Sequence, residues 1–373
     1  MTDLNEKTRL CSVCYKMCRD VCSVAGATRH EADSPHNRGF FAELVLEGKE
    51  SLNAEIVDYF YRCSMCKACR EACETGMDVS EIMLNARREL SSELLPENVK
   101  IAKEKIISGN YWGGDSPVVK KLISEQKAKK NEGTLFYFGK RTRAGSGDTI
   151  RSTLSIMGKL GVDFGIMEEE PSTGEIAYFL GFTHDAKKLG ELFCQKIKEL
   201  KPKKLVVFSA DDLRMIVKEY PFLGIELSGV DAISLPEFLL SLLKEKKPSF
   251  NMWDDGVVTY HDPCSLGREL RIFEAPRDIV KLIVKSEFKE MALTRDQAPC
   301  CGWGMGVEIS HHDLTPLMAK RLLSRAQDVG AKVMVTGCST CRDVLIQCEN
   351  KNRSEVNTIE ILDLPLFVER VFE

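Results

Sequence analysis

Eight cysteines in two short runs near the N-terminus constrain this chain more than any other feature. The whole chain has 15 cysteines in 373 residues, an odd number that internal disulfides cannot fully pair. The first ten residues, MTDLNEKTRL, lack the basic and apolar segments of a secretory signal, so we expect a reducing, cytoplasmic environment. Clustered cysteines in such a compartment bind metal or carry out redox chemistry.

The spacing of these runs predicts two [4Fe–4S] clusters. The first run is C-x2-C-x3-C-x3-C, and the second is C-x2-C-x2-C-x3-C. The second matches bacterial ferredoxins, in which three cysteines hold one cube and the fourth reaches the other. Zinc is the alternative, because four-cysteine zinc sites also use C-x2-C pairs. The predicted ligands are Cys11, Cys14, Cys18 and Cys73 for one cube, and Cys63, Cys66, Cys69 and Cys22 for the other.

Helical patterns surround the two runs. Ser51 is expected to cap a helix over 52–62, and Asp78 and Glu81 have the spacing of a capping box at the start of the next helix. Residues 1–92 are therefore predicted to form an α-helical dicluster ferredoxin-type domain. A turn-rich segment, SGNYWGGDSP, lies inside a predicted helical connector over 93–132.

From residue 133 onward, short apolar runs alternate with helical patterns, which predicts α/β units with parallel strands. Strands are expected over 134–139, 175–180 and 204–209, and again over 256–262 and 332–337. The overall fold class is thus an α-helical domain followed by α/β domains.

The α/β part contains a predicted internal repeat with an offset of 128 residues. This offset places Pro171–Gly174 on Pro299–Gly302 and residues 203–220 on 331–348. We therefore predict a degenerate CCG-type domain over 133–250 and a cysteine-containing one over 251–373. In the first copy the cysteine positions are occupied by Ser172, Thr173, Ala210 and Leu213.

The C-terminal copy carries five cysteines in the order Cys, Cys-Cys-Gly and Cys-x2-Cys, with gaps of 35 and 36 residues. This pattern resembles the cysteine-rich CCG domain of heterodisulfide reductase D and B subunits. The same domain occurs in the iron–sulfur subunits of glycolate oxidase and anaerobic glycerol-3-phosphate dehydrogenase. Matching segments include YHDPC at 260–264, EAPR at 274–277 and CCGWGMG at 300–306. The cysteines are Cys264, Cys300, Cys301, Cys338 and Cys341.

The resemblance implies that these five cysteines hold a third, non-cubane iron–sulfur cluster at a catalytic position, with zinc as the alternative. It also implies an iron–sulfur electron-transfer subunit of an oxidoreductase complex. The expected partner is a flavoprotein dehydrogenase or another redox subunit, with a quinone-linked membrane complex reached through that partner. One alternative function is a heterodisulfide or disulfide reductase subunit that reacts at the C-terminal cluster. Another is a zinc-stabilised scaffold without redox turnover.

Two further classes of ligand are not expected. The net charge is −4, from 52 basic and 56 acidic residues, whereas nucleic-acid binders usually have a basic excess. No G-x-G-x-x-G follows a predicted strand, so we expect no flavin or nicotinamide site in this chain.

Some other residues carry weaker signals. His261 could bind metal, although support of the neighbouring cysteine ligands is the simpler interpretation. Arg268 and Arg277 could tune cluster charge, bind an acidic substrate or form surface salt bridges. The remaining residues are expected to pack or to contact a partner: Cys194, Cys348, Trp112 and Trp303.

Overall fold

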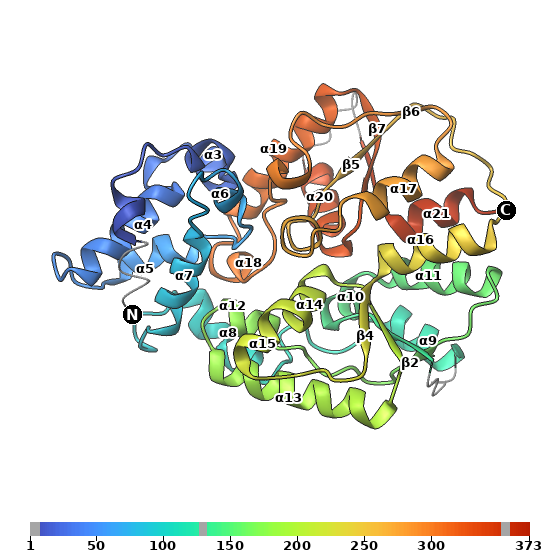
Figure 1. Cartoon of the computed structure of the whole chain (residues 1–373), viewed down its shortest axis with the longest axis horizontal. Coiled ribbons are helices and arrows are strands. Elements are labelled where there is room, and N and C mark those ends of the chain that lie inside the picture. Colours follow the sequence, from blue (N-terminus) through green and yellow to red (C-terminus); the bar gives the residue numbers. More distant parts are fainter. Residues whose placement is uncertain (1–7, 127–132, 352–358) are drawn as a thin grey trace.

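The N-terminal part of the chain is a bundle of short helices. The computed structural model describes residues 8–126, 133–351 and 359–373. In Figure 1 this bundle lies at one end of the molecule, beside two α/β domains. Its helices are α2 (Cys18–Val21), α3 (Ser23–Thr28), η1 (Glu31–Asp33), α4 (Pro35–Leu46), α5 (Ala54–Tyr61), α6 (Ala68–Glu71) and α7 (Val79–Arg88).

Local sequence determines where two of these helices begin. The side chain of Asn53 accepts a hydrogen bond from the Ile56 amide at 3.0 Å, so Asn53 and not the predicted Ser51 caps α5. Asp78 caps α7, as predicted, because its side chain accepts hydrogen bonds from the amides of Ser80 and Glu81.

Two helices follow as a connector: α8 (Glu97–Ile107) and α9 (Pro117–Gln126). The last residues of the predicted connector, 127–132, lie outside the described part of the chain. Trp112 lies in the loop between the two helices.

Each α/β domain has a parallel sheet, as predicted. Each sheet has four strands, and the two strand orders are equivalent: β2-β1-β3-β4 and β6-β5-β7-β8. The interpretation of this similarity as a sequence repeat stays a prediction. The first sheet has β1 (Thr134–Tyr137), β2 (Gly165–Ile166), β3 (Lys204–Val207) and β4 (Asp231–Ser234). The second has β5 (Val257–His261), β6 (Glu287–Phe288), β7 (Ala331–Thr336) and β8 (Glu360–Asp363).

Helices cover both sheets. Those of the first domain are α10 (Lys140–Gly145), α11 (Gly147–Lys159), α12 (Glu175–Phe179), α13 (Thr183–Leu200), α14 (Ala210–Arg214), η2 (Met215–Glu219), α15 (Tyr220–Leu223) and α16 (Leu235–Lys246). Those of the second are η3 (Ser265–Glu269), α17 (Glu274–Ile283), η4 (Arg295–Gln297), α18 (Val307–Ser310), α19 (Leu314–Asp328), α20 (Ser339–Lys351) and α21 (Leu364–Val371).

One predicted strand is wrong, because residues 175–179 form helix α12. Its apolar run is buried, and short buried runs do not distinguish a strand from a helix by periodicity. Gly174, at φ +84°, turns the chain into this helix.

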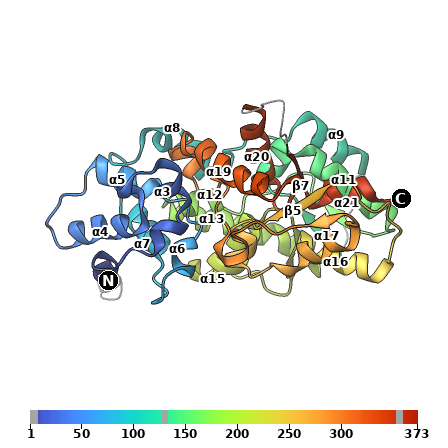
Figure 2. The same ribbon diagram turned by 90° about the horizontal axis from the view of Figure 1, so that it is seen from above.

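The two α/β domains pack against each other through helices, with α11 on α21 and α16 on α17. Figure 2 shows α11 beside α21 and α16 beside α17 from a second direction. The domains share one apolar core that includes Phe136 and Phe238 from the first domain and Tyr260 and Phe367 from the second.

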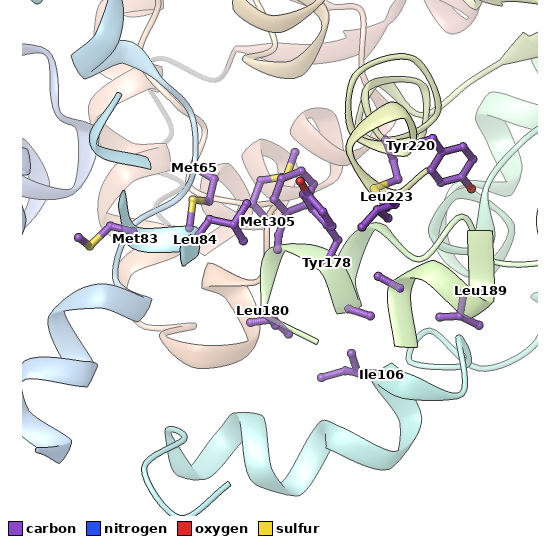
Figure 3. Packing of buried hydrophobic residues seen from close by; sticks show 14 of the residues in the cluster. Met65, Met83, Leu84, Ile106, Tyr178, Leu180, Leu189, Tyr220, Leu223 and Met305 are labelled. Carbon is purple, nitrogen blue, oxygen red and sulfur yellow. The ribbon is translucent and has the colours of Figure 1, made fainter. Parts of the chain in front are cut away.

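A second core joins all three parts of the chain, and Figure 3 shows part of it. Met65 and Met83 come from the N-terminal bundle, Tyr178 and Leu180 from the first α/β domain, and Met305 from the second. These five residues are buried, so the bundle is attached to both α/β domains by apolar packing. Within the described residues, no helix is long and apolar enough to cross a membrane.

Candidate metal centres

The first predicted cluster site lies near the surface of the N-terminal bundle. Its predicted ligands are Cys11, Cys14, Cys18 and Cys73; Cys11 is buried and Cys14 is exposed. Burial and the neighbouring thiols of Cys18, Cys14 and Cys73 raise the pKa of Cys11 to about 12. The helix α4 approaches closely, since a Cβ at Gly39 would lie 2.8 Å from the sulfur of Cys11. The fold thus brings these four cysteines together.

The second predicted site is more deeply enclosed. A small cavity is lined by all four predicted ligands, Cys22, Cys63, Cys66 and Cys69. Burial, together with the nearby Cys63, Asp78, Cys66 and Cys22, raises the pKa of Cys69 well above its usual value. Four thiols in such a cavity ionise only if a cation compensates them, so the donor set fits an iron–sulfur cube.

Arg38 supplies one positive charge at this second site. Its guanidinium is buried, with Nη1 3.9 Å from the sulfur of Cys22 and Nε donating to the carbonyl of Tyr59 at 3.0 Å. Burial alone would lower the pKa of Arg38, but Cys22, Cys63 and nearby Asp33 raise it. The arginine therefore stabilises the thiolate form of Cys63.

The C-terminal cysteines lie at the carboxyl ends of the strands in the second sheet. Cys264 follows β5, and Cys338 and Cys341 follow β7, the neighbouring strand. The chain leaves β5 toward β6 on one side and returns to β7 on the other, which creates the crevice where open α/β sheets place their sites. Cys300 and Cys301 enter this crevice from the loop after β6.

These five cysteines form one continuous group of thiols. The sulfurs of Cys301 and Cys341 are 3.3 Å apart. Hydrogen bonds with Cys264, Cys301 and Cys66 raise the pKa of Cys300, and hydrogen bonds with Cys300 and Cys341 lower that of Cys301. Cys341 in turn contacts Cys338. The turn requires glycine after the pair, because Gly302 has φ +95° and a Cβ there would lie 2.8 Å from the carbonyl oxygen of Thr315.

His261 belongs to the same group. One of its ring nitrogens and the sulfurs of Cys301 and Cys341 all lie within 4.8 Å of one another. The imidazole is 1% exposed, and within the described residues neither ring nitrogen has a hydrogen-bond partner. Imidazole and thiolate are ligands of zinc and iron, so this arrangement fits either direct ligation or support of the cysteine ligands.

The C-terminal group touches the second site of the N-terminal bundle, a contact that sequence reasoning missed. A hydrogen bond with Cys300 lowers the pKa of Cys66 well below its usual value. The amide of Cys300 also donates to the hydroxyl of Ser23 at 2.8 Å, and Ser23 directly follows Cys22. Cys66 and Cys300 are 234 positions apart in the sequence, and no local pattern signals their contact.

Two arginines hold the surrounding loops, and both are buried, so the surface salt-bridge interpretation is wrong. Arg268 donates to the carbonyl of Cys66 at 2.6 Å and also to that of Ala298. Arg277 forms a bidentate pair with Asp262, at 2.6 and 2.7 Å, just before Cys264. Both arginines therefore position the cysteine loops.

The remaining predicted residues lie outside the cysteine sites. Cys194 is buried on α13, where burial raises its pKa to about 11, and Cys348 is buried on α20. In the first α/β domain the hydroxyl of Thr173, which the predicted repeat aligns with Cys301, donates to Glu175 and contacts Asp212.

The fold and the cysteine groups define a class: a protein with a cysteine-rich helical domain in front of a cysteine-rich α/β domain. A family model of the 4Fe-4S dicluster domain matches residues 7–77. A family model of the cysteine-rich domain, CCG, matches residues 258–345. The chain therefore contains both kinds of domain.

Relatives share this combination. The D subunit of the dihydromethanophenazine:CoB–CoM heterodisulfide reductase from Methanosarcina barkeri is 25% identical over 349 residues, which cover 88% of this chain and 83% of that protein. The probable iron–sulfur-binding oxidoreductase FadF of Bacillus subtilis is 24% identical over 353 residues, 87% of this chain and 48% of that one. The predicted resemblance to the heterodisulfide reductase D subunits and related iron–sulfur oxidoreductases is confirmed.

A solved structure shares the fold. It is a hypothetical protein from Helicobacter pylori with a TM-score of 0.63 and 10% sequence identity, and the match covers 89% of this chain and 67% of that chain.

Proposed function

We propose that this chain is the electron-transfer subunit of an oxidoreductase complex, with two [4Fe–4S] clusters and a third cluster at the C-terminal cysteines. The contact between Cys66 and Cys300 is the observation that carries this proposal. Through this contact, a predicted ligand of the second cube lies against a predicted ligand of the C-terminal cluster. When bound, the clusters would supply one-electron redox chemistry.

The protein arranges the three cysteine groups in order of burial. Cys14, in the first group, is exposed, while the four cysteines of the second group are buried or half-buried. In the C-terminal group all cysteines except Cys264 are buried. This gradient supports one end open to a redox partner and one end enclosed for the terminal cluster.

A redox partner would meet the chain at the exposed end. Val13 is 78% exposed and Tyr15 is 99% exposed, on either side of Cys14. Aromatic side chains such as that of Tyr15 are enriched at protein interfaces. Among the relatives, heterodisulfide reductase D and fumarate reductase B are named as subunits, which supports a flavoprotein or other redox subunit as the partner here.

A second candidate function is catalysis of disulfide reduction at the C-terminal cysteines. It is favoured by a solvent-open cavity whose lining residues Trp303 and Arg342 follow Cys301 and Cys341 closely in the sequence. The isolated chain would then form thiol from a disulfide with an artificial electron donor, whereas an electron-transfer subunit would form none without its partner.

Iron and acid-labile sulfide, measured on anaerobically purified protein, test the cofactor content. We expect about twelve iron per chain and, after dithionite reduction, an EPR signal beyond those of two cubes, since two cubes account for about eight. The variant Cys264→Ala should lose the additional iron and signal but keep the cubane signals. Cys194→Ala, a buried cysteine outside the three groups, is the matched control. Zinc with little sulfide, and no incorporation of iron on reconstitution, would contradict the proposal.

A further inference from the structure

A cavity lies between the two α/β domains, and its lining includes residues that closely follow Cys301 and Cys341 in the sequence. Its volume is about 670 Å³, within the usual range for small-molecule sites, and it is open to solvent. Trp112 from the connector and Arg141 from α10 form one side, and Trp303 and Arg342 from the cysteine-rich domain form the other.

The walls of this cavity carry hydrogen-bond donors that lack acceptors. Among the described residues that line it, four buried nitrogens have no hydrogen-bond partner: Trp112 Nε1, Trp303 Nε1, Arg141 Nη1 and Arg342 Nε. Each belongs to a residue that lines the cavity. A buried donor without an acceptor is unfavourable, because it has lost its hydrogen bonds to water, so four at one place indicate a ligand rich in acceptor oxygens.

Of the two arginines that are mostly buried in this lining, Arg141 has the weaker ion pair. Arg342 is paired with Asp148, whose carboxylate is 3.0 Å from Nη1. The nearest carboxylate to Arg141 is that of Asp343 at 3.9 Å, too far for a hydrogen bond, and Asp343 already accepts from Ser146 at 2.7 Å. With Arg151, the lining has three guanidinium groups and two carboxylates, a formal charge of 3 − 2 = +1.

Aromatic rings hold the Arg141 guanidinium in place. Its Cζ lies 4.3 Å from the ring centroid of Trp303 and 5.1 Å from that of Trp112, and the two indoles are stacked 6.2 Å apart. Such cation–π contacts orient the planar guanidinium while its N–H groups stay available.

A neighbouring, much smaller cavity disfavours an anion. It shares Trp112, Arg141 and Trp303 with the outer cavity, but its lining also includes four carboxyl groups, those of Glu175, Asp211, Asp212 and Glu308. Burial raises the pKa of Glu308 to about 7, which reflects the poor solvation of negative charge in this place. A negatively charged group would therefore remain on the outer side, beside Arg141.

We propose that the outer cavity binds an organic oxyanion, a carboxylate or phosphonate, through Arg141 and the indole N–H groups of Trp112 and Trp303. The site is joined to the cysteine group, since the sulfur of Cys301 lies 3.9 Å from the carbonyl oxygen of Trp303. This inference deepens the second candidate function, reduction of a substrate at the C-terminal cysteines, and rests on it only for what the bound molecule would do there.

Calorimetric titration of the cluster-containing protein with 4-phenylbutanoate and with its uncharged amide, 4-phenylbutanamide, tests the site. We expect the carboxylate to bind at least about tenfold more tightly than the amide, because charge-assisted hydrogen bonds are stronger than neutral ones. Arg141→Gln should weaken carboxylate binding about tenfold or more, and Trp303→Phe, which keeps a ring but removes the N–H, should weaken it several-fold. Trp253 lies outside the cavity, so the control variant Trp253→Phe should bind the carboxylate as tightly as the unmodified protein does.

Equal binding of acid and amide, absence of binding at millimolar concentrations, or carboxylate binding unchanged in Arg141→Gln would overturn the proposal. Iron content and EPR spectra are measured on the same samples, with a zinc-containing sample as comparison. Carboxylate binding by protein that holds zinc as purified and takes up no iron on reconstitution would support the anion site and contradict the redox function, so the two failures are distinguishable.

Discussion

His261 is a buried polar side chain whose ring nitrogens have no nitrogen or oxygen partner among the described residues, and the thiol of Cys301 is its polar neighbour. Leaving a buried polar group without a hydrogen bond costs about 1–3 kcal/mol. Native structures avoid this cost unless the group has another use. The sulfurs of Cys301 and Cys341 lie close to the imidazole. An iron–sulfur cluster bound by these cysteines would use His261 as a ligand or as a hydrogen-bond donor to a ligand.

We expect His261→Gln to change the C-terminal cluster and leave the two cubes intact. Removal of a ligand or of its supporting residue commonly costs 10–100-fold in metal affinity. EPR spectra and iron content of the variant should therefore show loss or alteration of the third signal alone. The matched control is His312→Gln, which changes an exposed histidine. Unchanged spectra in His261→Gln would show that the imidazole only fills space.

Helix α5 shows how a small choice of residue sets the start of an element. Both Ser51 and Asn53 are good capping residues, but only one can occupy the position before the first helical turn. The structure selects Asn53, and the helix then buries Ile56, Val57 and Phe60 against the bundle core. This packing orients the segment that leads to Cys63.

Asn53→Ala should lower the free energy of unfolding by about 1 kcal/mol, since it removes the acceptor for the Ile56 amide. Ser51→Ala is the control and should change it by less than about 0.5 kcal/mol, because exposed substitutions away from caps have small effects. Anaerobic denaturation followed by circular dichroism measures both. The reverse order of effects would mean that Ser51 caps the helix in solution.

On the scale of the whole molecule, Arg87 links all three parts of the chain. This buried residue at the end of α7 donates to the carbonyls of Phe60 and Cys63 in the bundle at 2.9 and 2.8 Å. It also donates to Phe179 in the first α/β domain at 2.7 Å and to Met305 in the second at 3.4 Å. One guanidinium therefore satisfies backbone acceptors that would otherwise be buried without donors.

Arg87→Met should lower the free energy of unfolding by at least about 2 kcal/mol, because several buried carbonyls lose their donor. It should also alter the EPR signal of the cube predicted at Cys63, whose carbonyl Arg87 contacts. Lys100→Met, an exposed change on α8, serves as control. Denaturation curves and spectra like those of the unmodified protein would exclude a linking role for Arg87.

The amino-acid sequence determined which chemical groups this protein has and how they are grouped locally. The cysteine spacings predicted three groups and the resemblance that the comparisons confirm. Alternating runs predicted parallel sheets, and Asp78 predicted the start of α7. These features are visible because helices, strands and cysteine loops are specified over a few neighbouring residues.

The tertiary structure alone decided how those groups meet. It brought Cys66 against Cys300, buried Arg268 and Arg277, and placed Trp112 and Arg141 opposite Trp303. It also made residues 175–179 a helix. Such contacts join residues far apart in the chain, and they depend on how apolar faces of separate domains pack together. No local spacing encodes that packing, because burial is a property of the assembled core.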